Sequence, residues 1–211
     1  MVTTRTIQIF NQSGFAKSYV LFMQPPQTGS TPVFTNAWVT FDSITSGGFD
    51  SVAYDDSVYA YWGTSDTLAP GTVVSSGGVA LVDLSKSDRV SFAGSPPTGF
   101  GAVTQGQGSA GSFSIVAGAD FTPASGFVFG WAKAATSPVP VPVATTSALP
   151  NAVFTFMPTS QVFVAEYSSV SGQVIDVTEI SNAAEVDFTG KPQTTATVIQ
   201  RADGTFVVDY T

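Results

Sequence analysis

The sequence predicts an all-β protein, folded as a single domain over residues 1–211 into an antiparallel two-sheet sandwich of jelly-roll type or into a flattened barrel. Short apolar segments rich in β-branched and aromatic residues recur along the chain, separated by turns rich in Gly, Pro, Asn and Asp. No stretch of any length shows helical periodicity. Charged residues make up only 10% of the chain, a composition typical of strands rather than of helices or disordered segments.

The N-terminal segment predicts a first hairpin. Polarity alternates over Thr3–Phe10, and Lys17–Gln24 (KSYVLFMQ) is typical of a second strand. Asn11–Gly14 (NQSG) between them has turn chemistry. We therefore expect these two strands to pair with each other.

The segment Ala93–Gly111 predicts a long, flexible loop within the domain. It holds six glycines and two prolines. Loops of this length inside a compact domain are uncommon and often act as lids, although a plain surface insertion gives the same composition. We expect it to lie near enough to the preceding aromatic stretch to cover a site there.

A proline repeat follows at Pro138–Val143 (PVPVPV). Residues two apart on a strand direct their N–H groups to the same edge, so three alternating prolines remove donors from one edge only. This favours an outer edge strand with its proline side unpaired. An unpaired polyproline II segment is the alternative.

We expect the other strands to be arranged around the segment Ala152–Tyr167. It predicts two strands joined by a tight turn at Pro158–Ser160. Val162–Ala165 is apolar at consecutive positions, which indicates burial on both faces and therefore a central strand. We expect Phe163 to lie in the core.

The C-terminal segment predicts a second hairpin. Ala196–Arg201 and Thr205–Tyr210 are typical of strands, and Asp203-Gly204 lies between them. Asp-Gly between alternating strands is a strong hairpin signal.

Composition excludes several classes of function. The net charge is −8, and no two basic residues are adjacent, so we expect no binding to nucleic acid. The chain has no Cys and no His, which removes Ser-His-Asp and Cys-His catalysis and metal sites with His ligands. We expect no cofactor. No run approaches the roughly 20 apolar residues of a membrane span. The first residues lack the pattern of a signal peptide, which fits a cytoplasmic protein or a secreted one whose signal was removed.

The candidate ligand site is the aromatic stretch Tyr54–Trp62 (YDDSVYAYW). Alternation places Val58, Ala60 and Trp62 on one face and Tyr59 and Tyr61 on the other. Aromatic area beside charge suits a pocket that orients a ligand, whereas core packing is the alternative. The candidate ligand-binding residues are Tyr54, Tyr59, Tyr61, Trp62 and Trp38.

Acidic residues supply the candidates for catalysis. Asp55 and Asp56 are neighbours that converge only in a turn, where their oxygens suit Ca²⁺; a solvated turn is the alternative. Glu166 is in phase with Val162 and Val164, so it needs a polar partner or a raised pKa unless it lies beyond the buried part of the strand. A further acidic set suits either a solvated face or glycoside hydrolysis: Asp176, Glu179, Glu185 and Asp187.

Three hypotheses for function follow. The first is a non-enzymatic β-sandwich that binds a carbohydrate or another neutral small molecule. The second is a cofactor-free enzyme, such as a hydrolase, cyclase or isomerase, with Asp55, Asp56 and Glu166 as acid–base candidates. The third is a structural or self-assembling protein, with which a homo-oligomer is compatible.

Overall fold

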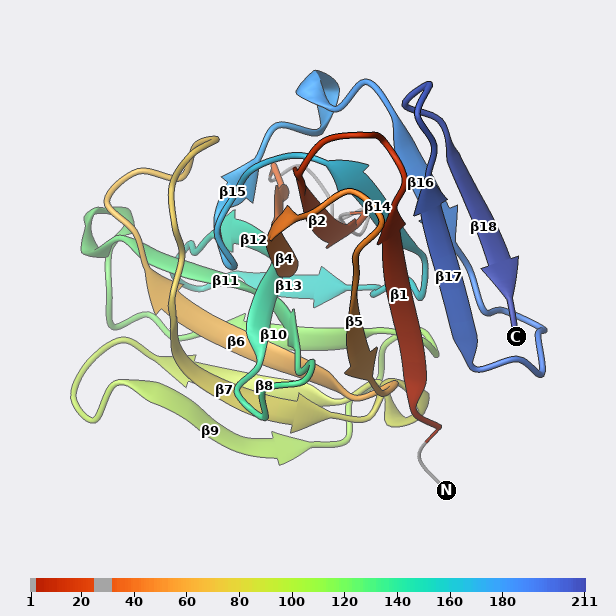
Figure 1. Cartoon of the computed structure of the whole chain (residues 1–211). Helices are drawn as coiled ribbons and strands as arrows, with labels where there is room; N and C mark the ends of the chain where they lie inside the picture. The colour runs from red at the N-terminus through yellow and green to blue at the C-terminus, as the bar shows by residue number, and fades with distance from the viewer. Residues whose placement is uncertain (1–2, 25–31) are drawn as a thin grey trace.

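The structure is a computed structural model that describes residues 3–24 and 32–211 (Figure 1). Strands dominate it, and helical structure in the described residues is limited to three 3-10 turns, η1 (Leu84–Lys86), η2 (Pro123–Ser125) and η3 (Val177–Glu179). The all-β prediction is therefore confirmed. In the same part of the chain, no helix has the length and apolar character needed to cross a membrane.

The strands form four sheets, and each four-stranded sheet is called by the name of one of its inner strands. The six-stranded sheet has the order β15 (Val174–Ile175), β3 (Phe34–Asn36), β12 (Val141–Ser147), β11 (Phe127–Lys133), β6 (Val58–Thr64) and β7 (Ser76–Val82). The β10 sheet has the order β13 (Val153–Phe156), β10 (Phe113–Ala117), β8 (Arg89–Ala93) and β9 (Gly99–Thr104). The β14 sheet has the order β16 (Ala183–Val186), β14 (Val162–Glu166), β2 (Lys17–Met23) and β4 (Val39–Ile44). The β17 sheet has the order β18 (Phe206–Tyr210), β17 (Thr195–Gln200), β1 (Arg5–Asn11) and β5 (Phe49–Tyr54).

Most of the strand pairs are antiparallel, as expected for a sandwich. The pairs β1–β17 and β8–β10 are parallel. Parallel neighbours need a long connection between them, and β1 and β17 lie at opposite ends of the sequence. The arrangement is thus sandwich-like but has four sheets, two of which contain a parallel pair.

The six-stranded sheet packs face to face with the β10 sheet through aromatic side chains. The ring of Phe92 on β8 lies 4.9 Å from that of Phe129 on β11 and 5.4 Å from that of Trp62 on β6, measured between centroids. Phe129 also meets Phe154 on β13, at 5.3 Å. The contacts of Phe129 with Phe92 and Phe154 are edge-to-face, and contacts of this kind add to the free energy of apolar burial.

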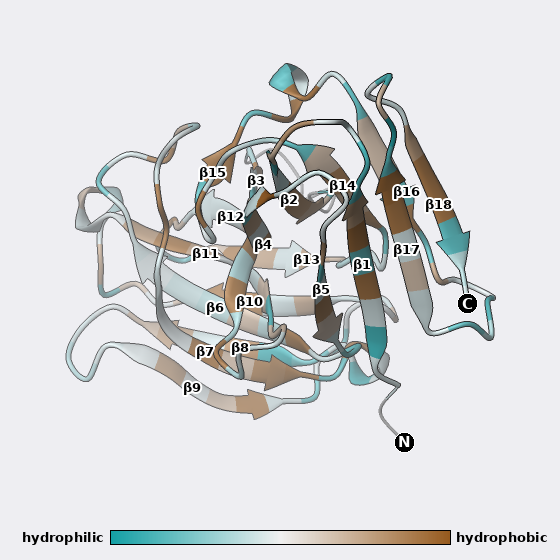
Figure 2. Cartoon of the chain, viewed as in Figure 1, coloured by the Kyte–Doolittle hydropathy of each residue, from teal (hydrophilic) through white to brown (hydrophobic). Residues whose placement is uncertain are grey.

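The β14 sheet packs in the same way on the β17 sheet. Tyr19 on β2 meets Phe206 on β18, with 6.4 Å between ring centroids. Ile7 and Ile9 on β1 and Leu21 on β2 are fully buried in the same hydrophobic cluster. That cluster also contains Phe92 and residues of all four sheets, so the two sandwiches share one continuous core. Figure 2 shows the apolar residues that β1 and β17 contribute to it.

The central-strand prediction for Val162–Ala165 is confirmed, because β14 pairs with β16 on one side and β2 on the other. Val162 and Val164 are fully buried in the main core. The opposite face carries Phe163, which is only partly buried and stacks on Phe22 at 5.4 Å. Phe163 is therefore not a residue of the main core.

The two hairpins expected at Ala152–Tyr167 and at Thr3–Gln24 are wrong. β13 pairs with β10, and β14 belongs to another sheet, so residues 157–161 cross between sheets. β1 and β2 likewise belong to facing sheets. The buried side chain of Asn11 holds that crossing by donating hydrogen bonds to the carbonyls of Phe15 and Ile44. Turn residues mark where a strand ends but do not say whether the chain turns back in the same sheet.

The C-terminal hairpin is confirmed, since β17 and β18 pair antiparallel around Asp203-Gly204. Gly204 has φ of +81°, which glycine adopts without strain. Asp203 accepts hydrogen bonds from the amide and the hydroxyl of Thr205 and fixes the turn.

β12, which contains the end of the repeat Pro138–Val143, lies inside the six-stranded sheet between β3 and β11, so the strand as a whole is not an edge strand. The unpaired side predicted for the repeat is confirmed in the described part of the chain, because Val141 and Pro142 pair with β11 alone. Only Pro142 of the three prolines lies within β12, opposite Ala132 of β11. In the part of the chain that the structure describes, β3 pairs with β12 only at Ala144 and Thr145, beyond the last proline. The proline repeat can therefore be part of an inner strand, because it ends before the residues at which β12 pairs with β3.

The segment Ala93–Gly111 is not a continuous loop, because its middle forms β9. This strand pairs antiparallel with β8 and is the outer strand of the β10 sheet. Glycine allows β9 to lie close to β8, because a methyl group on Gly101 would lie 2.5 Å from Oγ of Ser91 on β8. Two of the six glycines of the segment, Gly99 and Gly101, lie in this strand, and the other four lie in the loops on either side of it.

Candidate functional site

The aromatic stretch predicted as a ligand site packs against other elements on both faces, with Tyr59 and Trp62 left partly exposed. Tyr61 is fully buried, and Tyr54 and Trp38 are 5% and 1% exposed. Trp62 packs with the main core, and Tyr59 packs with Tyr61 in a second cluster. The segment 93–111 does lie beside it, since a methyl group on Gly99 would be 3.8 Å from Nε1 of Trp62. The alternation was assigned correctly, but neither face of β6 is free to form an aromatic platform.

Tyr61 instead belongs to a buried hydrogen-bond network. Its hydroxyl bonds to that of Thr145 on β12, which donates to Oδ1 of Asn36 on β3 over 2.6 Å. The amide of Asn36 donates to the carbonyl of Gly172 at 2.9 Å. Burial raises the pKa of Tyr61 well above its ordinary value, and the bond to Thr145 opposes this in part. This network joins three strands and has a structural role.

Asp55 and Asp56 do not form a shared carboxylate site. Asp55 accepts a hydrogen bond from the amide of Ser57 at 2.9 Å, as is usual in a turn. Asp56 is exposed and pairs with Arg5 of β1 at 2.5 Å. Over residues 3–24 and 32–211, no group of three acidic side chains lies close enough together to hold a metal ion.

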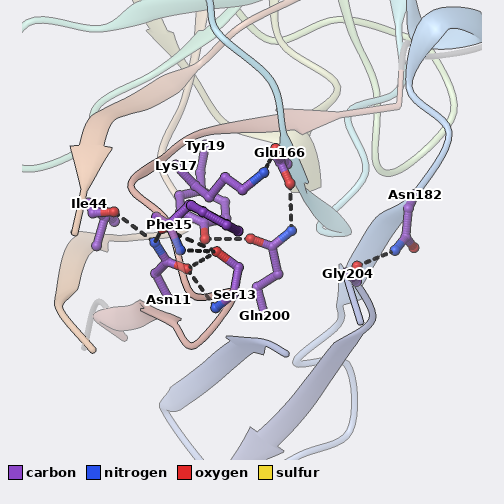
Figure 3. Close-up of polar contacts among 10 residues, drawn as sticks. All are labelled: Asn11, Ser13, Phe15, Lys17, Tyr19, Ile44, Glu166, Asn182, Gln200 and Gly204. Atoms are coloured by element: carbon purple, nitrogen blue, oxygen red, sulfur yellow. Dashed lines mark hydrogen bonds and ion pairs between the residues drawn. The ribbon is translucent and has the colours of Figure 1, made fainter. Parts of the chain in front are cut away.

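Glu166 lies at the end of β14 and has several polar partners (Figure 3). Lys17 on β2 donates to Oε1 of Glu166 at 2.5 Å, and Gln200 on β17 donates to Oε2 at 2.7 Å. The hydroxyl of the fully buried Tyr19 donates to Oε1 of Gln200 at 2.6 Å. The chain of bonds therefore runs from the core to the carboxylate, across two facing sheets.

These bonds favour the ionised form of Glu166. Burial disfavours its ionised form, but hydrogen bonds from Lys17 and Gln200 outweigh burial and hold the pKa of Glu166 below its ordinary value. Burial, and next the charge of Glu166, raise the pKa of Tyr19 well above its ordinary value, so Tyr19 remains a donor. The amide of Gln200 is thereby fixed in one orientation, with its oxygen towards Tyr19.

A groove of about 390 Å³ opens beside Glu166. It lies between the segment from η3 to β16 and the turn from β17 to β18, at the top of Figure 1. The hydrophilic residues of these two segments are visible in Figure 2. Among the described residues, seven supply side chains to it: Glu166, Glu179, Ile180, Ser181, Asn182, Gln200 and Phe206.

Asn182 joins two of the segments that line the groove. Its amide donates to the carbonyl of Gly204 at 2.8 Å, which ties the segment before β16 to the turn between β17 and β18 (Figure 3). Phe206 is partly buried against Tyr19 and shows its remaining surface to the groove. Of the described residues that line the groove, none is Lys or Arg.

The other acidic candidates are dispersed. Asp176 caps η3 by accepting from the amide and hydroxyl of Thr178, and these bonds hold its pKa below the ordinary value. Asp187 makes the same kind of bonds with Thr189, with the same effect on its pKa. Glu185 is exposed on β16, and Glu179 alone of this set lines the groove. The structure therefore gives turn or surface positions to most of this set.

The sequence reasoning missed Gln200, Asn182 and Lys17. A signal existed for Gln200, because it continues the buried phase of Ala196 and Val198 on β17, where a polar side chain needs a partner. Asn182 lies in an irregular segment and gave no such signal. Lys17 is far from Glu166 in sequence, and only the pairing of β2 with β14 brings them together.

These features define a sandwich-like all-β protein with a polar groove between two of its sheets. A family model described as RhiA matches residues 2–211, and the chain belongs to the RhiA family. No curated protein and no solved structure matches the chain.

Proposed function

We propose that this protein is a non-enzymatic binding protein and that the groove beside Glu166 holds a neutral polyhydroxylated molecule, such as a mono- or disaccharide. The observation that carries the proposal is the chain of hydrogen bonds from Tyr19 through Gln200 to Glu166. These bonds hold the amide of Gln200 and the carboxylate of Glu166 in fixed positions before any ligand binds, and such pre-organisation lowers the entropic cost of binding.

The chemistry of the groove suits sugar hydroxyls. A carboxylate accepts hydrogen bonds, and an amide both donates and accepts them. Glu166, Gln200 and Asn182 supply such groups, and Ser181 adds a hydroxyl. Phe206 and Ile180 provide apolar surface for the C–H face of a ring. The volume of about 390 Å³ lies within the range of small-molecule sites.

The charge of the groove favours a neutral ligand over an anion. Two of its side chains are carboxylates, and the charge of Glu166 is offset by Lys17 at 2.5 Å. The chain as a whole carries a net charge of −8. An anionic ligand would be repelled by the carboxylates of the groove and by the net charge of the chain, and the described lining of the groove holds no Lys or Arg to bind it.

Catalysis has less support than binding at this site. A general acid at neutral pH needs a carboxyl group with a raised pKa, whereas the partners of Glu166 lower its pKa. Glu166 is therefore suited to accept hydrogen bonds from a ligand and poorly suited to protonate one.

The proposal is tested by calorimetric titration with a panel of neutral sugars: glucose, galactose, mannose, N-acetylglucosamine, maltose and lactose. We expect at least one of them to bind, and Glu166→Gln to weaken that binding about tenfold or more, because a hydrogen bond to a charged group is lost. Glu185→Gln makes the same chemical change on the exposed surface of β16 and is the matched control. Glucuronate, the anionic counterpart of glucose, should bind more weakly than glucose.

Two results would reject this site. One is equal affinity in wild type and Glu166→Gln for a sugar that binds. The other is the absence of binding by every sugar in the panel. In the second case, sedimentation at several protein concentrations would test the assembly hypothesis, which predicts a concentration-dependent mass.

A further inference from the structure

A second cavity of about 160 Å³ lies apart from the groove and shares no lining residue with it. Five of its residues carry side-chain hydrogen-bond donors: Arg5 on β1, Tyr54 at the end of β5, Lys133 at the end of β11, and Thr159 and Ser160 in the segment before β14. Met23, Val58 and Leu84 supply apolar walls. The cavity thus combines converging donors with a hydrocarbon surface.

The hydroxyl of Tyr54 is the first sign that this cavity takes a ligand. Tyr54 is 5% exposed, and its buried oxygen makes no hydrogen bond of good geometry with the described residues, although the guanidinium of Arg5 lies near enough to oppose the rise in its pKa. Burial raises the pKa of Tyr54 to about 12, so the group remains a neutral donor near pH 7. A buried hydroxyl without a partner costs free energy, and a ligand oxygen in the cavity would remove that cost.

Lys133 is the second sign. Its side chain is buried, and its ammonium group donates to the carbonyls of Asp55 at 2.9 Å and Ser57 at 3.2 Å. An ammonium group has three N–H donors, so one remains beyond these two bonds. The ammonium lies 5.6 Å from the centroid of the Tyr54 ring, which places both donors at the same cavity.

Arg5 supplies the third donor group. Its Nη1 pairs with Asp56 at 2.5 Å, and its guanidinium lies 5.4 Å from the centroid of the Phe188 ring. A guanidinium has five N–H donors in a planar fork that matches a carboxylate. The charged side chains that line the cavity are Arg5, Lys133 and Asp56, which is one net positive charge in a chain of net charge −8.

We propose that this cavity is a binding site for a small organic carboxylate, whose oxygens accept hydrogen bonds from Tyr54, Lys133 and Arg5. Among the described residues of the lining, the one carboxylate, Asp56, is already paired with Arg5, so the ammonium and guanidinium groups and the hydroxyls remain to donate to a ligand. Its volume equals that of about five water molecules at ~30 Å³ each, which suits a short aliphatic chain against Met23, Val58 and Leu84.

The test is a calorimetric titration near pH 7 with propionate, its neutral counterpart propionamide, and inorganic phosphate. We expect saturable binding of propionate at one site and at least tenfold weaker binding of propionamide. Tyr54→Phe removes one hydroxyl and keeps the buried ring, so this variant should fold but bind propionate about tenfold more weakly. Tyr59→Phe, on β6, the next strand in the sequence, and outside the cavity lining, is the matched control.

A pH series adds an independent readout. Burial lowers the pKa of Lys133 to about 8, the charges of Asp56 and Asp55 oppose that shift, and Arg5 adds to it. Tyr54 stays protonated throughout this range. Propionate binding should therefore weaken as the pH rises through about 8, and Lys133→Met should remove this dependence.

Several results would overturn the proposal. Equal affinities for propionate and propionamide would show that charge is not recognised, and tighter binding of phosphate would point to another ligand class. Unchanged affinity in Tyr54→Phe, or no saturable binding of propionate to wild type, would reject the site. The groove beside Glu166 is unaffected by any of these outcomes, because the two sites share no residue.

Discussion

The side-chain amide of Gln200 on β17 donates a hydrogen bond of 2.7 Å to the carboxylate of Glu166 at the end of β14. These residues belong to different sheets, so the bond joins the two facing sheets at the rim of their sandwich. The same amide accepts from the buried hydroxyl of Tyr19. Hydrogen bonds in such a chain polarise and strengthen each other.

Replacing Gln200 by Met should therefore destabilise the protein, because it leaves the hydroxyl of Tyr19 buried without a partner. We expect a loss of about 2 to 4 kcal/mol in the free energy of unfolding, measured in urea. Tyr19→Phe in the same background should recover at least about 1 kcal/mol of that loss. Purely additive effects of the two substitutions would contradict the coupled network.

Lys133 should make stability depend on pH in a defined window. Its pKa is lowered by burial to about 8, whereas an unfolded lysine titrates near 10.5. Between these values the unfolded chain binds more protons than the folded one, so stability rises with pH, by about 2 kcal/mol from pH 8 to 10. Above pH 10 the trend reverses, because burial raises the pKa of Tyr54 and the folded state then binds more protons.

Urea unfolding at a series of pH values measures this effect. Lys133→Met should remove the rise between pH 8 and 10, while Lys191→Met, which changes an exposed lysine, should retain it. The same slope in Lys133→Met as in wild type would show that another group titrates in this window.

Phe92 should matter more to stability than Phe163. Its ring contacts those of Trp62, Phe100, Phe121, Phe127 and Phe129, with centroids 4.9 to 6.0 Å away. Phe92→Ala should cost about 3 to 5 kcal/mol, the usual range for a buried phenylalanine. Phe163→Ala should cost less than half as much, because that ring is only partly buried. A larger loss for Phe163→Ala in urea unfolding would contradict the burial that the structure shows.

Gly130 on β11 should not tolerate a side chain. A methyl group there would lie 1.8 Å from the carbonyl oxygen of Ala144 on β12 and 2.5 Å from the ring of Tyr61. Since the first obstacle is backbone, Gly130→Ala should lower the free energy of unfolding by several kcal/mol or prevent folding. Gly108→Ala meets nothing closer than 3.2 Å and is the control. Similar melting temperatures for the two variants would contradict the close approach of β11 and β12.

Local sequence patterns predicted most strands, because alternation and apolar runs reflect burial directly. The faces of β6 and the central position of β14 follow from such patterns. Pairing could not be predicted in the same way, because it depends on contacts distant in sequence. β1, for example, pairs in parallel with β17 across nearly the whole chain, and no local signal near Asn11 distinguishes a hairpin from a crossing between sheets.

For the candidate sites too, single residues could be predicted from the sequence but contacts between distant residues could not. Glu166 was predicted from its phase on a strand, and Gln200 could have been found by the same reasoning. Their meeting depends on how two sheets pack, which the sequence alone does not show. The aromatic stretch Tyr54–Trp62 was rich enough in aromatic area for a pocket, but the packing of sheets over both its faces uses that area for the core.

The most direct test of the binding proposal is an NMR titration of the ¹⁵N-labelled protein with the neutral sugar of the panel that binds most tightly. The account predicts saturable shifts of backbone amide signals concentrated at Ser181, Asn182, Gly204 and Phe206, with the same shifts absent in Glu166→Gln at equal sugar concentration. Shifts concentrated elsewhere on the protein, or shifts at these residues that persist unchanged in Glu166→Gln, would contradict it.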